Sequence, residues 1–527
     1  MENGGFVMEL EDSKKADKQT ESDVVASTPT HTFEEAVSLV PVGKFHYYML
    51  LVGGLCFMTV MVEVTCVSII LPSMKCDLVS TVAEQGMLAS SGFLGIVLSS
   101  HAMGFFADTW GRIKTLRAAL AFAAISSLIS AFSVNIWMMI FFRFLTGFLI
   151  SGGQACVFSL TGEFHGNKSR TKHVTLLSGF LPLSIMYLPT LAAFVLPIRI
   201  ETVIFGMKFS SWRLLLISNC VPSLLALFGL FLMPETPKYV LIQGQHDRAL
   251  EILRWMFVKN TGKPVSEYPV RHITIQNNGA NLANITGIKD AVKLVWNQTA
   301  PLFYRERCLH TINICIIQFV VLGIAQGIFM WFPTLLNEMV STKDFPVDVC
   351  NTLSNMDPTT NLHSDICNGI VDLFPFMVIA AVGGAFTFFY LFFSFTIDMI
   401  GKKNLILTWI IIATICVALL HWITNFYVNI VLLTFTMSVG NVGGLISTIS
   451  MEFFPTNINA MGMCFVMMMG RIGAVVGSNV LGLLLFDYCE LTMWVILGIY
   501  AVVFFMSCFL PVSKYEQRNK VVHATSN

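Results

Sequence analysis

The chain has 527 residues, of which 55% are hydrophobic and 12% are charged, and this balance is too apolar for a soluble protein of that size. Lysine plus arginine equals aspartate plus glutamate, at 32 each, so the net charge gives no reason to expect a nucleic-acid partner. We therefore predict an integral, multi-pass membrane protein.

The chain opens with a polar leader over 1–44, rich in Glu, Asp, Lys, Ser and Thr, which we expect to be largely disordered. A membrane-spanning helix needs about 20 mostly apolar residues, and twelve such runs follow the leader. The first six lie at 46–71, 86–107, 116–134, 136–160, 174–197 and 212–233. The other six lie at 309–336, 370–397, 404–424, 426–451, 460–486 and 490–511.

This spacing predicts an all-α fold with two bundles of six transmembrane helices, over 45–233 and 309–511. The central segment between them, 234–308, is predicted to carry short amphipathic helices, because apolar and charged residues recur at helical spacing over 241–257. A short tail over 512–527 ends the chain.

Basic residues indicate the orientation, because lysine and arginine gather on the cytoplasmic side of a membrane. They fill the connections at 112–117 and 168–172, the central segment 234–308 and the tail, whereas the loop at 134–136 carries no charge. Both termini and the central segment are therefore predicted to be cytoplasmic. The pattern is compatible with the plasma membrane and with a secretory or synaptic vesicle membrane.

A polar turn separates the second and third runs, with the pattern G-x-x-x-D-x-x-G-R-x-K from Gly104 to Lys114. A weaker copy follows the eighth run, where Asp398, Gly401 and Lys402 stand in the same relative places. Two copies in matching positions indicate that the two halves of the chain are internally duplicated.

Further motifs accompany this turn. They include Arg143-Phe-Leu-Thr-Gly147 in the fourth run, Pro234-Glu-Thr-Pro237 after the sixth and Gly470-Arg-Ile-Gly473 in the eleventh. Together these stretches resemble the major facilitator superfamily, and within it the group of synaptic vesicle glycoprotein 2 and organic-ion transporters. The resemblance runs from about residue 33 to 511 and implies alternating access to a central site.

Two charged residues inside the membrane stand out, because each costs several kcal/mol there unless it is paired or hydrated. Glu63 and Arg143 both lie roughly 12–14 Å below the outer surface, at 1.5 Å per residue. In proton-coupled sugar porters an acid in the first span faces an arginine in the fourth, so the resemblance implies that Glu63 and Arg143 form a coupling pair with protons as the partner ion. The alternative is a static ion pair that joins two helices.

Charges at the cytoplasmic helix ends predict a gate that joins the two halves when the cavity opens outward. Asp108 is expected to face Arg471, and Arg112 is expected to face Glu163. The predicted gate residues are Asp108, Gly111, Arg112, Glu163, Arg170, Asp398, Lys402, Glu452 and Arg471.

In the second half, the gate prediction is less specific. Asp398 and Lys402 are expected to engage structure near Arg213 and either Glu235 or Glu452.

A substrate cavity is expected where polar and aromatic side chains interrupt the apolar runs near the centre of the fold. The candidates are Tyr187, Gln318, Gln326, Trp331, Tyr390 and Asn441. For each of them a hydrogen bond between helices, or an aromatic side chain at the membrane interface, is at least as good an interpretation.

The cysteine positions and the lack of a nucleotide-binding motif limit the functions that the sequence predicts. Cys350 and Cys367 share one outer loop, where either a disulfide or two free thiols is compatible with the sequence. No metal-ligand spacing, cofactor motif or G-x-x-x-x-G-K-[ST] loop occurs, so we predict neither an enzyme nor an ATP-driven pump.

The sequence thus predicts a monomeric secondary transporter for a small organic solute, either an organic ion or a sugar-like molecule. The alternative, from a different class, is a non-transporting vesicle protein that uses the fold as a scaffold or receptor. The expected partners are the solute, the lipid bilayer and protons.

Overall fold

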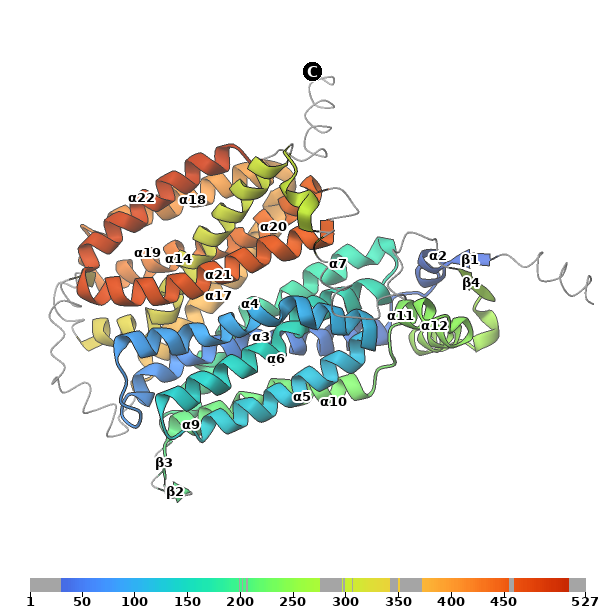
Figure 1. Cartoon of the computed structure of the whole chain (residues 1–527), viewed down its shortest axis with the longest axis horizontal. Coiled ribbons are helices and arrows are strands. Elements are labelled where there is room, and N and C mark those ends of the chain that lie inside the picture. Colours follow the sequence, from blue (N-terminus) through green and yellow to red (C-terminus); the bar gives the residue numbers. More distant parts are fainter. Residues whose placement is uncertain are drawn as a thin grey trace, which may run out of the picture.

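The computed structural model describes residues 30–198, 200, 202–204, 207–274, 296, 299–305, 307–341, 349–350, 372–454 and 459–510 (Figure 1). The first bundle contains α3 (Lys44–Met74), α4 (Val82–Trp110), α5 (Arg112–Ala131), α6 (Ile136–Phe164), α7 (Asn167–Ser178), α8 (Phe180–Val195), α9 (Ser211–Ser218) and α10 (Cys220–Phe231). The second bundle contains α14 (Cys308–Ser341), α17 (Phe374–Ile400), α18 (Lys402–Leu420), α19 (Phe426–Ser438), η4 (Val439–Asn441), α20 (Val442–Phe453), α21 (Asn459–Asp487) and α22 (Cys489–Cys508).

The helices match the predicted apolar runs. In the described part of the chain, eleven helical stretches are long and apolar enough to cross a membrane. The shorter apolar helix α8 continues α7 across Gly179 and supplies the remaining span. The predicted all-α, twelve-span fold is therefore confirmed.

Two spans of the first bundle are interrupted for a clear chemical reason. α7 ends at Ser178, four residues before Pro182, and α9 ends at Ser218, four residues before Pro222. Proline has no N–H for the carbonyl four residues earlier, so the helical hydrogen bonding is locally broken at both places. The interruption divides the fifth span into two helices, α7 and α8.

The bundles lie side by side, the first coloured blue to green and the second yellow to red in Figure 1. They meet where α4 packs on α21, α8 on α17 and α3 on α14. Glycine permits the close approach of α17 and α8, because a Cβ at Gly383 would lie 2.8 Å from the backbone nitrogen of Met186. Small residues of this kind are typical of helix contacts in membranes.

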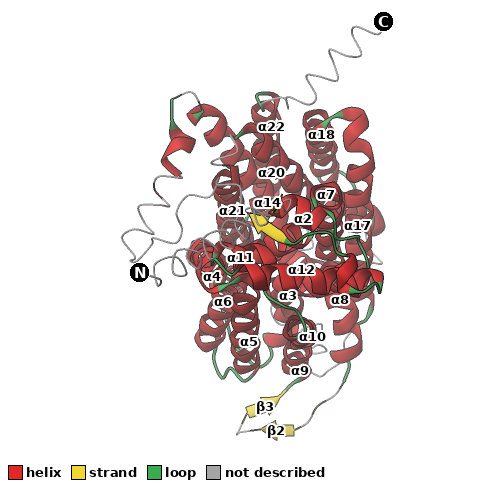
Figure 2. Ribbon diagram, turned by 90° about the vertical axis from the view of Figure 1, so that its right-hand side faces the viewer, coloured by secondary structure: helices red, strands yellow, loops and turns green. Residues whose placement is uncertain are grey.

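The two ends of the molecule differ, as Figures 1 and 2 show. The α12 end carries α2 (Phe33–Ser38), α11 (Pro237–Ile242), α12 (His246–Thr261), η1 (Val265–Glu267), and the parallel strands β1 (Thr30–Thr32) and β4 (His272–Thr274). The opposite end, here called the hairpin end, carries the antiparallel strands β2 (Thr202–Ile204) and β3 (Met207–Phe209). The short turn η3 (Ala300–Phe303) precedes α14.

The amphipathic α12 buries its apolar face against the first bundle and the end of the leader. Its buried residues are Ala249, Leu250, Ile252, Leu253, Met256 and Phe257. The Tyr268 hydroxyl donates to the Ala36 carbonyl of α2 over 2.8 Å. The leader was expected to be largely disordered, but its last part forms β1 and α2 on this surface.

Candidate functional site

A cavity of about 210 Å³ lies between the bundles. Its lining comes from α3, α4 and α8 on one side and from α14, α17, α19, η4, α20 and α21 on the other. Most of the lining is apolar, with Phe93, Ile185, Leu322, Phe329 and Phe386 among its walls. Such walls suit a ligand with an apolar body, and the polar groups among them set its orientation.

The polar lining residues come mainly from the second bundle. They are Thr65, Gln318, Gln326, Tyr390, Asn441 and Arg471. Among the lining residues that the structure describes, Arg471 alone carries a charge. Its Nη1 donates to the Ser100 hydroxyl of α4 over 3.3 Å, so this side chain also connects the two bundles.

Three lining amides have atoms that are not satisfied. Within the described residues, Gln318 Oε1, Gln326 Oε1 and Asn441 Nδ2 are buried and have no hydrogen-bond partner. An unpaired buried polar atom typically costs about 1–3 kcal/mol. Three such atoms around one cavity indicate a binding site in which water or a ligand supplies the missing hydrogen bonds.

The structure places four of the six predicted cavity residues in this lining. Trp331 is not among them, because its Nε1 donates to the Ser478 carbonyl over 2.8 Å on another side of α14. Tyr187 also lies off the cavity, although Ile185 lines it. Two residues along a helix turn the side chain through about 200°, which points Tyr187 away from the site.

Glu63 and Arg143 form an ion pair behind the cavity. The Arg143 Nη1 to Glu63 Oε2 distance is 2.9 Å, and each side chain is only 2% exposed. Met61 and Thr65 of the same helix line the cavity. Glu63 stands two residues from each of them and faces α5 and α6 instead.

Two serines of α5 complete this ion pair. Ser127 donates to Glu63 Oε2 over 2.9 Å, and Arg143 Nη2 donates to Ser130 over 2.7 Å. Arg143 Nη1 also lies 3.1 Å from the Cys66 sulfur. The two buried charges are thus embedded in hydrogen bonds, which is the condition for a buried ion pair to be tolerated. Sequence reasoning missed the serines because they lie on a third helix.

The predicted gate partners are partly brought together. Arg112 Nη1 lies 2.6 Å from Glu163 Oε1. Both residues belong to the first bundle, so this ion pair does not itself join the halves, contrary to the gate hypothesis. Gly111 supplies the turn before Arg112, with a φ of 106° that favours glycine.

The contacts of Glu235 differ from another part of the gate prediction. Its carboxylate accepts from the backbone N–H groups of Ile113 and Lys114, at 3.0 and 3.3 Å, and so caps the start of α5. It therefore belongs to the first bundle's turn and not to a contact with Asp398 or Lys402.

Arg213 was also expected near that contact, but it lies at the hairpin end of the bundle. There its Nη1 donates to the carbonyls of Ala131 and Ser133, both at 2.8 Å.

The remaining gate residues are less fully described. Arg170 bonds Glu34 of α2 over 2.7 Å, a partner in the leader that the sequence did not indicate. Lys402 begins α18 after Gly401, whose φ of 84° repeats the turn at Gly111. The side chains of Asp108, Asp398 and Glu452 lie outside the described part of the structure.

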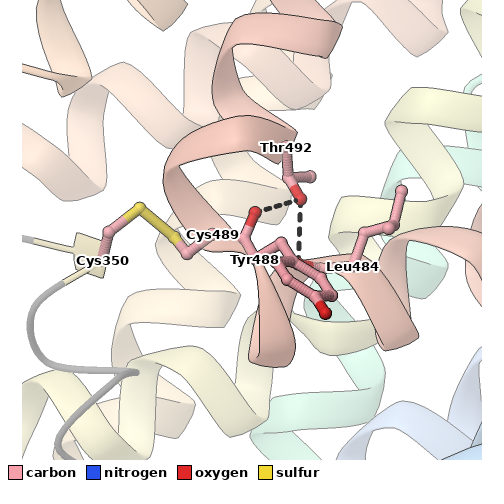
Figure 3. The surroundings of a disulfide bond; sticks show 5 residues. All are labelled: Cys350, Leu484, Tyr488, Cys489 and Thr492. Carbon is pink, nitrogen blue, oxygen red and sulfur yellow. Dashed lines mark hydrogen bonds between the residues drawn. A yellow bond between two sulfur atoms is a disulfide. The ribbon is translucent and has the colours of Figure 1, made fainter.

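Cys350 forms a disulfide with Cys489, the first residue of α22 (Figure 3). Neither alternative for Cys350, a disulfide with Cys367 or a free thiol, is therefore correct, and Cys367 lies outside the described residues. The two Cα atoms are 5.3 Å apart because the start of α22 lies beside the segment that follows α14. Cys350 and Cys489 are 139 residues apart, so no pattern within one loop indicates this pairing.

The fold and the cavity define a multi-pass membrane transporter. A family model described as Major Facilitator Superfamily matches residues 53–478. The chain belongs to the Major Facilitator Superfamily.

Two curated relatives are similar in sequence. Synaptic vesicle glycoprotein 2B of Mus musculus is 27% identical over 323 residues, which cover 58% of this chain and 47% of that protein. The chain thus matches about half the length of that relative. Putative transporter svop-1 of Caenorhabditis elegans is 24% identical over 475 residues, which cover 89% of this chain and 82% of that protein.

Two solved structures share the fold. The inward open conformation of the xylose transporter XylE from E. coli has a TM-score of 0.62 at 14% identity, covering 89% of this chain and 97% of that one. A nucleoside transporter NupG structure has a TM-score of 0.58 at 14% identity, covering 89% and 100%. At these identities the likeness shows the fold alone.

Proposed function

We propose that this protein is a secondary active transporter that moves a small organic solute across the membrane by alternating access. The observation that carries the proposal is the cavity between the bundles, with three buried amide atoms that have no partner among the described residues. A site at the interface of two bundles is exposed to one side or the other when the bundles rock.

The lining favours an organic anion over a sugar-like solute. A sugar presents hydroxyls over its whole surface, whereas most of these walls are apolar side chains. Arg471 lines the same cavity as the amides of Gln318 and Asn441, and a guanidinium binds carboxylate groups well. The proposed solute is therefore small and amphiphilic, with one anionic end.

Proton coupling is the proposed role of Glu63. Protonation would remove the charge that Arg143 and Ser127 now bind, so the contacts of α3 with α5 and α6 would weaken. Because Met61 and Thr65 of α3 line the cavity, a shift of α3 would reach the solute site. The static ion pair remains the competing hypothesis.

Uptake by the full chain in proteoliposomes tests the transport proposal. The panel would contain small amphiphilic carboxylates, with organic cations and sugars as separate arms. Tyr390→Phe should change the apparent affinity for a transported solute because Tyr390 lines the cavity, and the matched control Tyr187→Phe should not. A stably folded protein that transports none of the panel would favour the scaffold or receptor alternative.

Coupling needs a separate measurement. Glu63→Gln should abolish the dependence of uptake on an imposed pH gradient, while the exposed acid Glu490 gives the control Glu490→Gln. Unchanged uptake and pH dependence in Glu63→Gln would establish the static ion pair.

A further inference from the structure

Three buried histidines are stacked at the α12 end, outside the cavity and the coupling pair. His46 lies in α3, His165 follows α6 and His173 lies in α7. The ring centroids of His46 and His165 are 4.5 Å apart, and those of His165 and His173 are 4.1 Å apart. The three side chains, called the histidine stack below, are at most 4% exposed.

The hydrogen bonds of His46 and His165 fix which ring nitrogen carries the proton in the neutral form of each ring. His46 Nε2 donates to the Phe164 carbonyl over 3.0 Å, so its Nδ1 is the acceptor for the Asn260 amide at 2.9 Å. His165 Nδ1 donates to the Thr161 carbonyl over 2.8 Å. Its Nε2 is buried and has no hydrogen-bond partner in the described structure.

The surroundings disfavour a proton on His165. Burial, followed by the neighbouring His46, lowers the pKa of His165 to about 3. Arg170 adds to this effect from α7, and its guanidinium is paired with Glu34 of α2.

Other groups face the stack from the elements around it. From α6, Glu163 is paired with Arg112. From α3, the ring of Tyr47 packs near His173 at a centroid distance of 6.4 Å. Lys168 and Lys172 of α7 have side chains outside the described part of the chain.

The stack joins three segments that are distant in sequence. Asn260 of α12 accepts from the Phe45 backbone and donates to the Pro41 carbonyl, each over 2.9 Å. At the other side, α2 reaches the α6–α7 junction so closely that a Cβ at Gly166 would lie 2.7 Å from Ser38 Cα. The leader and α12 are thus held to α7 through the stack and through the Glu34–Arg170 pair.

We propose that the histidine stack is a proton-sensitive joint that holds α7 against α2 and α12 while neutral and releases α7 on acidification. Protonation of His165 would place a charge between two other imidazoles and beside Arg170, in a site where no carboxylate of the described residues bonds that ring. Separation of the segments exposes the histidines to water, where they accept protons at their ordinary pKa near 6.5.

The joint controls the position of one half of the fifth span. α7 is separated from α8 at Gly179, and α8 supplies Leu181 and Ile185 to the cavity. Release of α7 therefore changes access to the cavity from the α12 end without altering its lining. This inference does not rest on solute transport, and its test uses the protein without solute.

Hydrogen exchange of the full chain in lipid nanodiscs tests the joint. After correction for the intrinsic effect of pH on exchange, the release of His165 should make the amides of α7 exchange roughly eightfold faster at pH 5.5 than at pH 7.0. The exposed His246 of α12 gives the control, because His246→Gln should leave this ratio unchanged.

Substitutions distinguish the two interactions of the joint, which are the histidine stack and the Glu34–Arg170 ion pair. His165→Gln should make the exchange of α7 much less dependent on pH, and His173→Gln gives a second test if the first variant does not fold. Glu34→Gln should raise exchange at both pH values and leave the ratio unchanged, because it removes only the ion pair. The proposal is overturned if wild-type α7 exchanges equally at both pH values, or if both histidine variants keep the full wild-type ratio.

Discussion

The coupling pair and the cavity lie on opposite faces of α3, and they differ in how completely their polar groups are satisfied. Glu63 and Arg143 bind each other and are supported by Ser127 and Ser130, and of their buried side-chain polar atoms Arg143 Nε alone has no partner in the described structure. The cavity amides, by contrast, keep three buried atoms without partners in the described structure. A network of polar groups that have hydrogen-bond partners stabilises one structure, whereas buried polar atoms without partners can bind a ligand. The two regions should therefore respond differently to mutation.

Removing one member of the coupling pair should have the largest effect on stability. Arg143→Met leaves Glu63 buried without its cation, and breaking a buried ion pair in this way costs about 3–5 kcal/mol. The measurement is thermal or denaturant unfolding in detergent.

A double variant sharpens this test. Glu63→Met combined with Arg143→Met removes both charges, so most of the lost stability should return. If the double variant is as unstable as Arg143→Met, the loss comes from packing and not from an uncompensated charge.

The low pKa of His165 predicts how the stability of the protein depends on pH. The folded pKa of His165, about 3, lies below the ordinary value near 6.5, so the unfolded chain binds more protons between these values. Stability is therefore complete above pH 6.5 and decreases as the pH falls through this window, by roughly 2 kcal/mol between pH 6.5 and 5. Unfolding midpoints of wild type and His165→Gln over this range would measure it, and parallel curves would contradict the assignment to His165.

The cavity should show the opposite pattern, with function lost and stability kept. Asn441→Leu removes an amide whose Nδ2 has no partner in the described residues, so unfolding should change little. Uptake at low solute concentration should fall about tenfold, because one hydrogen bond to the solute is lost. A large loss of stability with unchanged uptake would show that this amide has a structural role.

Sequence reasoning found these two regions to different degrees. Glu63 and Arg143 could be predicted as a pair because charges in apolar runs are conspicuous and their depths match. Gln318 and Gln326 lie eight residues apart on one helical face, and both line the cavity. Helical phase would also have excluded Trp331, which follows Gln326 by five residues.

Other features depend on contacts that no local pattern contains. Cys489 bonds Cys350 because the start of α22 lies beside the segment that follows α14 in the folded chain. Arg170 forms an ion pair with Glu34, which lies 136 residues earlier in the sequence. The helix that carries Glu34 did have a local signal, since Thr32 and Glu35 form a capping box with the T-x-x-E spacing.

The variant Ser130→Ala has a small expected effect and is the most specific test of the hydrogen bonds around the Glu63–Arg143 ion pair. The Ser130 hydroxyl accepts from Arg143 Nη2 over 2.7 Å, so Ser130→Ala should destabilise the protein by about 1.5 kcal/mol, as expected for a hydrogen bond to a charged group. Ser133 is equally buried, but its Oγ has no partner in the described structure, so Ser133→Ala should be close to neutral. Equal losses in the two variants would mean that packing at this end of α5, and not support of Arg143, determines the stability. A loss confined to Ser130→Ala would show that the ion pair depends on its serine shell, because the guanidinium keeps only Ser127, at 3.3 Å, as a hydroxyl acceptor on that nitrogen.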